Sequence, residues 1–235
     1  MKNILLNTDI DRILKRIYRK RFFSKKIIKS SELTTIINKS VIEGETLKLF
    51  YLWGIYDKRN KNNYDDLALL FLSKFINHIK AVVECPVEFT IVLTDAHAKI
   101  NLIAPETTSA YSNEIQAWAF TQKWRVVMLS DIWMKYGLTE EQISDYIETM
   151  PANSIDKLLM NFSTKYYKDK DKEKGAMRYY AARTLEKKII EDDFASYIHI
   201  TAADTRLDYL QPDMPHFHIW TLKKGKSAKP WFLSE

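Results

Sequence analysis

Residues 47–103 are the part of this sequence that most restricts what the chain can fold into. LKLFYLW (47–53) and EFTIVLT (88–94) are short apolar runs of the kind that form buried strands. The segment from about Tyr64 to Lys80, between them, carries apolar residues at helical spacing. A strand, a helix and a second strand in this order predict a βαβ unit with two parallel strands.

Polar residues of types that bind substrates or transfer protons follow each of these two strands. They are Asp57, Lys58, Arg59 and Asn60 after the first strand, and Asp95, His97 and Asn101 after the second. In open α/β sheets, ligands bind outside the carboxyl ends of the strands. The sequence therefore predicts a site at this edge of the sheet.

The rest of the chain continues the alternation of helices and strands. Further helices are expected at 108–120, 138–150, 153–166 and 176–193, and further strands at 99–103, 124–130, 195–201 and 216–224. The helix at 138–150 opens with a Thr-x-x-Gln capping box, and the charged stretch 168–175 reads as a linker, hinge or lid. This pattern predicts an α/β fold: a three-layer, modified Rossmann-like domain with a largely parallel sheet and a mixed edge.

Charge is concentrated at the N-terminus. Residues 1–30 hold ten of the 36 Lys and Arg residues but two of the 30 Asp and Glu residues, so this segment carries +8 and the remainder −2. Apolar residues from Ile10 to Tyr18 recur at helical spacing opposite the basic ones. We expect a basic amphipathic helical arm at residues 1–40, ahead of an α/β catalytic domain at 41–235. The arm suits an anionic partner, although a simple surface helix explains the same pattern.

Several classes of protein are excluded by composition. No two of the five glycines lie closer than ten residues, so neither a GxGxxG fingerprint nor a Walker phosphate loop can occur. The single Cys85 allows no disulfide within the chain, and HExxH, CxxC and GxSxG are absent. No run is long enough to span a bilayer, and the N-terminus does not read as a secretory signal, so a cytoplasmic location is expected.

Candidate catalytic and substrate-binding residues follow the two strands at 47–53 and 88–94 and lie on the expected helix at 176–193. Asp95 can hold an ammonium or hydroxyl groups and His97 can move protons, unless they form an ordinary Asx turn. Lys58 and Arg59 suit a phosphate, or a plain soluble loop. On the expected helix at 176–193, Arg178 and Arg183 are suited to binding a phosphate or carboxylate group. They lie about 140° apart on the helix, so one of them is expected to face a site, with a surface ion pair to Glu186 or Asp192 as the alternative.

A metal site is the weaker alternative. His216 and His218 alternate in a predicted strand and would point to one face, where His199 and Asp213 could complete a ligand set. Isolated pairs of this kind are common in ordinary strands. We therefore expect no metal.

The order of these motifs resembles the isonitrile (isocyanide) synthase family of pyoverdine and dityrosine biosynthesis. The similar segments include Lys58 and Asn60 with DLA (66–68), TDA (94–96) with NL (101–102), and YSNEI (111–115). VVMLSDIW (126–133), AR (182–183), IH (198–199) and PW (230–231) follow in the family's order. The resemblance spans about residues 47–232. The family's Gly is here Ala96, its second Asp is Asn101, and the His after Pro-Trp is Phe232.

This resemblance implies an enzyme without metal or cofactor that condenses the amine of an amino acid, aromatic by expectation, with ribulose 5-phosphate to form an isocyanide. Lys58, Arg59 and Arg183 would hold the sugar phosphate, with Asn60, Asn101 and Arg178 as further substrate-binding residues. Asp95 would bind the ammonium or sugar hydroxyls, and His97 and His199 would move protons. All of this requires the loops of Lys58 and Asp95 to meet the Arg183 helix around one cleft.

Two alternatives remain from the sequence. One is an aminoacyl-tRNA-dependent enzyme of the cyclodipeptide synthase type, which the basic arm would suit but which uses a serine after the first strand, where WGIY (53–56) has none. The other is a non-catalytic binding or effector protein that keeps the fold and docks through its arm.

Overall fold

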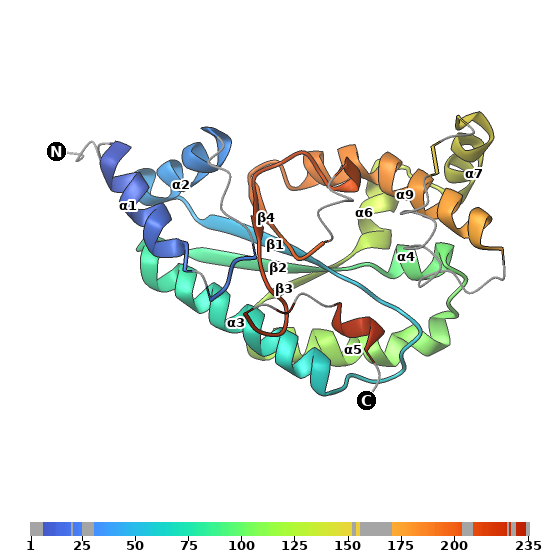
Figure 1. Ribbon diagram of the computed structural model, residues 1–235, viewed down its shortest axis with the longest axis horizontal. Coiled ribbons are helices and arrows are strands. Elements are labelled where there is room, and N and C mark those ends of the chain that lie inside the picture. The colour runs from blue at the N-terminus through green and yellow to red at the C-terminus, as the bar shows by residue number, and fades with distance from the viewer. Residues whose placement is uncertain are drawn as a thin grey trace.

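The computed structural model describes residues 7–19, 21–24, 31–151, 154–155, 171–203, 209–224, 226 and 229–233, with side chains from Ile10 onward. A five-stranded sheet runs through the middle of the molecule (Figure 1). Its strands are β1 (Leu47–Trp53), β2 (Val87–Leu93), β3 (Arg125–Met128), β4 (Tyr197–Thr201) and β5 (His216–His218). The spatial order is β3-β2-β1-β4-β5, and every pair of neighbours is parallel.

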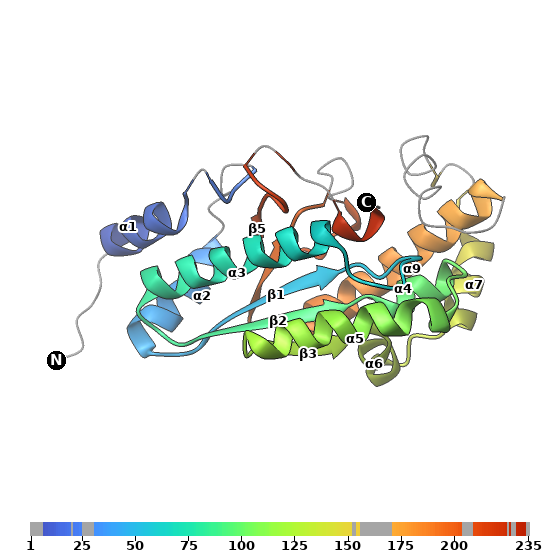
Figure 2. The ribbon, with the colours of Figure 1, turned by 90° about the horizontal axis from the view of Figure 1, so that it is seen from below.

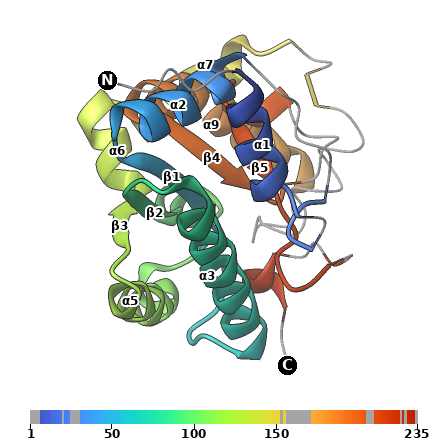
Figure 3. The same ribbon diagram turned by 90° about the vertical axis from the view of Figure 1, so that its left-hand side faces the viewer.

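Helices cover both faces of the sheet. The first ones in the chain are α1 (Asn7–Ile17), α2 (Ser31–Glu43), α3 (Asn63–Val83), α4 (Asp95–Ile100) and α5 (Pro105–Thr121). The later ones are α6 (Leu129–Tyr136), α7 (Glu140–Thr149), α9 (Lys172–Asp193) and the short 3₁₀ helix η2 (Pro230–Phe232). α3 and α5 lie on one face, and α6 and α9 lie on the other, which makes three layers (Figures 1 and 3).

Strand periodicity divides the core between these two faces. Leu49, Tyr51 and Trp53 of β1 pack in the cluster that contains the apolar side of α3, whereas Phe50 packs with α6 and α9. Alternate side chains of a strand point to opposite faces, so an uninterrupted apolar run is what a strand covered on both sides requires.

The basic helix α1 contributes its apolar side to the same core. Ile10, Leu14 and Ile17 are buried in the cluster of α3, and the Nε2 atom of His78 on α3 donates hydrogen bonds to the carbonyl oxygens of Arg16 and Ile17. The basic side chains of Arg12, Lys15, Arg16 and Arg19 remain exposed. Because its apolar side is covered, α1 presents charge rather than an amphipathic face to the solvent.

The structure confirms the predicted α/β architecture and corrects parts of it. The expected mixed edge is wrong, because β5 pairs in parallel with β4. Antiparallel pairing among the described residues is limited to two isolated bridges, Phe23–Ile219 and Lys223–Lys226. Residues 99–103 form no strand, since the chain enters α4 directly after β2. The two predicted strands at 124–130 and 216–224 are shorter than expected, and the first ends where the unpredicted helix α6 begins.

Two other expectations concern the region before α9. Residues 172–175 belong to the first turn of α9 rather than to a loop. The expected helix at 153–166 and the rest of the charged stretch lie mostly outside the described residues. None of the helices that the structure describes combines the length and hydrophobicity that a bilayer crossing requires.

Candidate functional site

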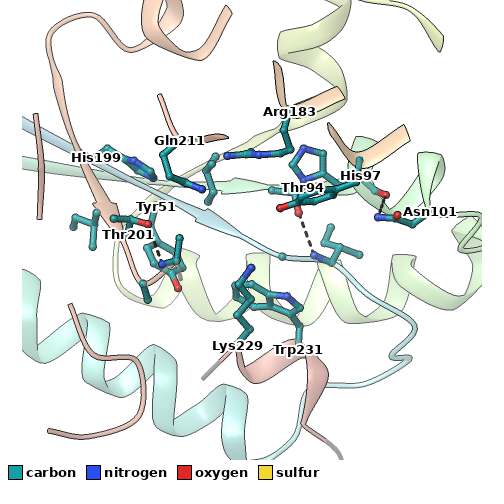
Figure 4. A pocket seen from close by; sticks show the side chains of 17 residues that line it. Tyr51, Thr94, His97, Asn101, Arg183, His199, Thr201, Gln211, Lys229 and Trp231 are labelled. Carbon is teal, nitrogen blue, oxygen red and sulfur yellow. Dashed lines mark hydrogen bonds between the residues drawn. The ribbon is translucent and has the colours of Figure 1, made fainter. Parts of the chain in front are cut away.

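A cavity opens at the carboxyl ends of β1, β2 and β4, with a volume of about 80 Å³. The strand order reverses direction between β1 and β4, and open α/β sheets bind ligands at such a switch point. The volume holds several water molecules or the polar head of a small substrate. Its labelled side chains surround one space in Figure 4. The polar ones are Tyr51, Thr94, His97, Asn101, Tyr179, Arg183, His199, Thr201, Gln211 and Lys229.

His97 is held in place by a buried carboxylate. It lies in the short helix α4, and its Nε2 atom is 2.8 Å from Oε2 of Glu186 on α9. An ionised Glu186 only accepts hydrogen bonds, so Nε2 of His97 carries the hydrogen. The Nδ1 atom is then the nitrogen that accepts a proton in the neutral imidazole and donates one in the imidazolium. This arrangement suits a general acid and base.

Glu186 is completely buried and fully engaged. Its Oε1 atom accepts from Nη1 of Arg183, and Oε2 also accepts from Nε1 of Trp133 at 3.1 Å. Burial alone would raise the pKa of this carboxyl, but the charges of His97 and Arg183 and the hydrogen bonds from His97 and Trp133 outweigh it, so the pKa is lowered. The carboxylate therefore stays ionised although no water reaches it.

Arg183 joins this network to the opposite side of the cavity. Its side chain is 5% exposed, and Nη2 donates to the carbonyl oxygen of Leu210 at 3.0 Å. The guanidinium therefore binds Glu186 and the segment that precedes β5 at the same time. In Figure 4 it lies beside the cavity, across from Lys229.

His199 is the buried, neutral imidazole of the site. It lies in the central part of β4, stacks on the ring of Phe50 with centroids 4.7 Å apart, and is 2% exposed. Burial, and after it the positive charges of His216, Arg183 and His218, lower its pKa well below the ordinary 6.5. This imidazole is neutral at physiological pH.

One wall of the cavity comes from the last described segment of the chain. Lys229 and Trp231 line it, and Trp231 packs against Trp53 with ring centroids 5.6 Å apart. A Cβ atom on Gly54 would lie 2.1 Å from the Trp231 indole, closer than any real contact. Gly54 follows β1, so the missing side chain there makes room for the aromatic wall.

Lys58 fixes this wall from outside the cavity. Its Nζ atom pairs with the buried carboxylate of Asp65 and lies 3.4 Å from the carbonyl oxygen of Pro230. Tyr111 donates to the other oxygen of Asp65 at 2.8 Å and accepts from Nε1 of Trp53. Asp65 also completes the capping box at the start of α3 with Asn62, whose amide donates to the Leu233 carbonyl at 2.7 Å.

The structure brings together four of the residues singled out in the sequence. His97, Asn101, Arg183 and His199 all line the cavity. The amide nitrogen of Asn101 donates to the carbonyl oxygen of His97 at 2.7 Å, and its Oδ1 atom is buried with no hydrogen-bond partner in the described part of the chain. The fragments 94–101 and 183–199 therefore meet as the sequence suggested.

The other predicted residues lie elsewhere. Lys58 is engaged with Asp65, and Asp95 accepts a hydrogen bond from the backbone of Ser130 at 3.0 Å instead of facing the cavity. Arg59 and Asn60 are exposed in the loop before α3. Arg178 lies 3.8 Å from Glu140 on α7.

Sequence reasoning missed the carboxylate at the centre of the site. Glu186 was considered only as a surface partner of Arg183, whereas the pair is buried. The i,i+3 spacing of the two residues on one helix was the available signal. Lys229 carried no such signal, since it precedes Pro230 in a segment without regular periodicity.

No three His, Cys, Asp or Glu side chains gather in a metal-binding arrangement within the ranges that the structure describes. His216 is exposed, and Nε2 of His218 donates to the carbonyl oxygen of Ala203 at 2.8 Å. The four-residue set considered from the sequence therefore has no structural support.

Comparison with known proteins gives evidence on the fold. No family model and no curated protein matches the sequence. The crystal structure of the PvcA protein from Pseudomonas aeruginosa superposes with a TM-score of 0.60 at 16% identity, over 94% of this chain and 87% of that one. Tyrosyl-tRNA synthetase from Archaeoglobus fulgidus, in complex with L-tyrosine, gives a TM-score of 0.52 at 14% identity, over 89% of this chain and 64% of that one. The fold is therefore Rossmann-like, with its cavity at the switch point of the sheet.

Proposed function

We propose that this chain is an enzyme of the isonitrile synthase type, which condenses the amine of an amino acid with ribulose 5-phosphate. Three observations support this function. The order of sequence motifs resembles that family, and PvcA, which belongs to it, shares the fold over 94% of this chain. The cavity also joins a fixed imidazole to cationic side chains.

The observation that carries the proposal is the contact between His97 and Glu186 at the cavity wall. A carboxylate that holds a histidine tautomer in place leaves the other ring nitrogen ready to exchange protons with a substrate. Glu186 receives three donors and so has a structural reason to remain ionised. If the pair of His97 and Glu186 only stabilised the fold, the imidazole of His97 would have no need to line a cavity.

The first step of such a condensation needs proton transfers that His97 can supply. The attacking amine loses a proton as it adds to the sugar ketone, and the resulting hydroxyl must gain a proton to leave as water and give the imine. One imidazole performs both transfers by acting first as base and then as acid. Cleavage of a carbon–carbon bond would follow and leave one carbon as the isocyanide.

An aromatic amino acid is the favoured amine substrate. The tyrosyl-tRNA synthetase that shares this fold was solved with L-tyrosine. In this chain, Tyr51, Tyr179 and Trp231 line the cavity and provide apolar ring surface beside its polar groups.

The direct test is to incubate the purified protein with L-tyrosine or L-tryptophan and ribulose 5-phosphate, and to look for the isonitrile by mass and infrared absorption. His97→Gln should lower turnover by about 100-fold or more, because general acid–base catalysis contributes roughly this much. His216→Gln, an exposed imidazole on β5 outside this cavity, is the matched control and should retain activity. Absence of any isonitrile from the wild-type protein would reject this reaction.

An aminoacyl-tRNA-dependent reaction is the second candidate. The likeness to the synthetase and the exposed basic side of α1 favour it. Because the apolar side of α1 is buried, removing residues 1–30 would expose the core, so Lys15→Gln with Arg16→Gln is the cleaner test. If that double variant loses a salt-sensitive tRNA affinity and with it all activity, the second candidate replaces the first.

A further inference from the structure

The two edges of the sheet differ in how they are covered. At the β5 edge, residues 22–24 run beside the strand: Phe23 forms an antiparallel bridge with Ile219, and the backbone N–H of Ser24 donates to the carbonyl oxygen of His218 at 3.1 Å. β3 pairs with β2 alone, and no other residue that the structure describes bonds to its backbone. The free edge of β3 therefore presents unpaired N–H and C=O groups.

The side chains at this free edge are apolar and incompletely covered. Val126 and Met128 pack toward the cluster that contains α5, whereas Val127 packs toward the cluster of α6 and α9. All three side chains remain half-buried. Water can satisfy the backbone of such an edge, but only another protein segment would also remove these apolar groups from water.

Helix α5 adds a large exposed ring beside β3. Phe120 is 82% exposed, and it follows Tyr111 by nine residues, or about two and a half helical turns. The two side chains therefore lie on opposite sides of α5. Tyr111 donates to Asp65 of α3, so Phe120 lies on the side away from α3. In Figure 3 the direction from α3 to α5 is also the direction from β2 to β3, which places the ring on the open side of the sheet.

We propose that two copies of this chain pair through their β3 edges in antiparallel fashion, about a two-fold axis at Val127. Opposite residues of an antiparallel pair point to the same face, so this axis sets Val127 against Val127 and Val126 against Met128. Each cluster of one copy then continues into the same cluster of the other. Four strand residues cannot bury the roughly 800 Å² per partner of a standard interface, so the flanking helices, with Phe120, complete it.

Charged groups around β3 fit this symmetry. Lys123 and Arg125 are exposed at the start of the strand, and Asp131 is exposed in the first turn of α6, just after its end. Within the described residues, none of these three side chains has an ion pair. Antiparallel pairing brings the basic start of one β3 to the acidic end of the other, and the symmetry repeats this contact. Basic residues alone would serve to keep an edge unpaired, whereas the added carboxylate makes this edge complementary to itself.

This inference is independent of the reaction proposed for the cavity, because β3 contributes no residue to the described part of the cavity lining. Sedimentation equilibrium of the full chain tests it directly. The wild-type protein should sediment at twice its 27.7 kDa at micromolar concentration. Phe120→Ser should weaken the dimer by about 10-fold or more, since a buried ring is lost from both copies. Leu70→Ser, which changes an exposed leucine on α3, is the matched control and should dimerise as wild type does.

Charge reversal tests the antiparallel order of the strands. Arg125→Glu and Asp131→Lys should each weaken the dimer by about 10-fold or more, because each places like charges opposite one another twice. The double variant that combines both changes restores opposite charges and should regain most of the affinity. Since both side chains are exposed, these variants should fold normally.

A cysteine at the axis tests the register. Residue 127 would face its own counterpart with Cα atoms about 4.5–5.5 Å apart, which a disulfide can bridge. Mild oxidation of Val127→Cys in a Cys85→Ser background should therefore link two copies, whereas Val126→Cys, offset by two residues from its counterpart, should not be linked. A chain that stays monomeric at all concentrations would reject a second copy as the partner of this edge. A dimer that Phe120→Ser leaves intact, or that Arg125→Glu weakens without rescue by Asp131→Lys, or that Val127→Cys fails to link, would also overturn the proposal.

Discussion

The Nε2 atom of His97 lies 2.8 Å from Oε2 of Glu186, although 89 residues separate the two in sequence. One residue stands in the short helix after β2 and the other in the second turn from the end of α9. Their contact joins the two halves of the sheet across its switch point. The strength of this interaction can be measured by substituting either His97 or Glu186.

Glu186→Gln should lower both stability and turnover. The buried Arg183 would keep its charge without a carboxylate, and loss of one partner of a buried pair costs about 3–5 kcal/mol. Asp192→Asn, which breaks the exposed pair with Lys188 on the same helix, should cost about 1 kcal/mol or less. Urea unfolding at pH 7 measures both. Similar losses in the two variants would show that Glu186 is not a buried ionised group.

Lys58→Met should destabilise the protein far more than Lys61→Met. Asp65 is fully buried and would lose its counter-charge, which we expect to cost about 3 kcal/mol or more. Lys61 pairs with the exposed Asp66, and such surface pairs contribute about 1 kcal/mol at most. The free energies of unfolding in urea give the comparison. Equal effects would argue against a buried carboxylate at Asp65.

Gly54→Ala should displace the aromatic wall of the cavity. The added Cβ atom would fall within 2.1–2.6 Å of three atoms of the Trp231 indole. Overpacking of this kind costs about 1–3 kcal/mol. Trp231→Leu in the same chain should remove most of the clash, so the two changes should be clearly non-additive in thermal unfolding. Additive losses would contradict the direct contact.

Stability should fall as the pH drops below about 6.5, and His199 should account for part of the loss. Its folded-state pKa lies below the ordinary 6.5, so the unfolded chain binds more protons between the two values and is favoured as the pH decreases. One such histidine contributes up to about 1.4 kcal/mol per pH unit.

His199→Phe keeps a ring against Phe50 and removes the titration. The variant should therefore lose less stability than wild type between pH 7 and pH 5 in urea titrations. His78→Gln serves as a comparison. Burial also lowers the pKa of His78, so this histidine contributes to the loss of stability at low pH as well. An unchanged pH dependence in His199→Phe would contradict a neutral, buried His199.

Local patterns were sufficient to predict most of the elements. The run 47–53 matches β1 at both ends, since an apolar strand covered on both faces leaves an uninterrupted signal. The Thr139–Gln142 capping box is present at the start of α7 as expected. α4 was mistaken for a turn and a return strand, because six residues are too few to show a helical period.

The site was only half predictable, for a physical reason. The end of β2 locates His97 and Asn101 from sequence, since parallel strands bring their carboxyl ends together. Which charged residue pairs with which depends on tertiary contacts. Lys58 stands in a polar loop that reads as a phosphate site, yet Asp65 in the next helix captures it. Glu186 and Lys229 reach the cavity through packing that no short sequence window contains.

The parallel sheet places the basic helix α1 and the candidate site at opposite ends of the molecule. Figure 2 shows α1 beyond the amino ends of β1 and β2, and α4 beyond their carboxyl ends. The basic side chains and the catalytic candidates therefore occupy opposite poles of the molecule. A large polyanion held at the first pole would leave the second open, so tethering and turnover could proceed at the same time without competing for room.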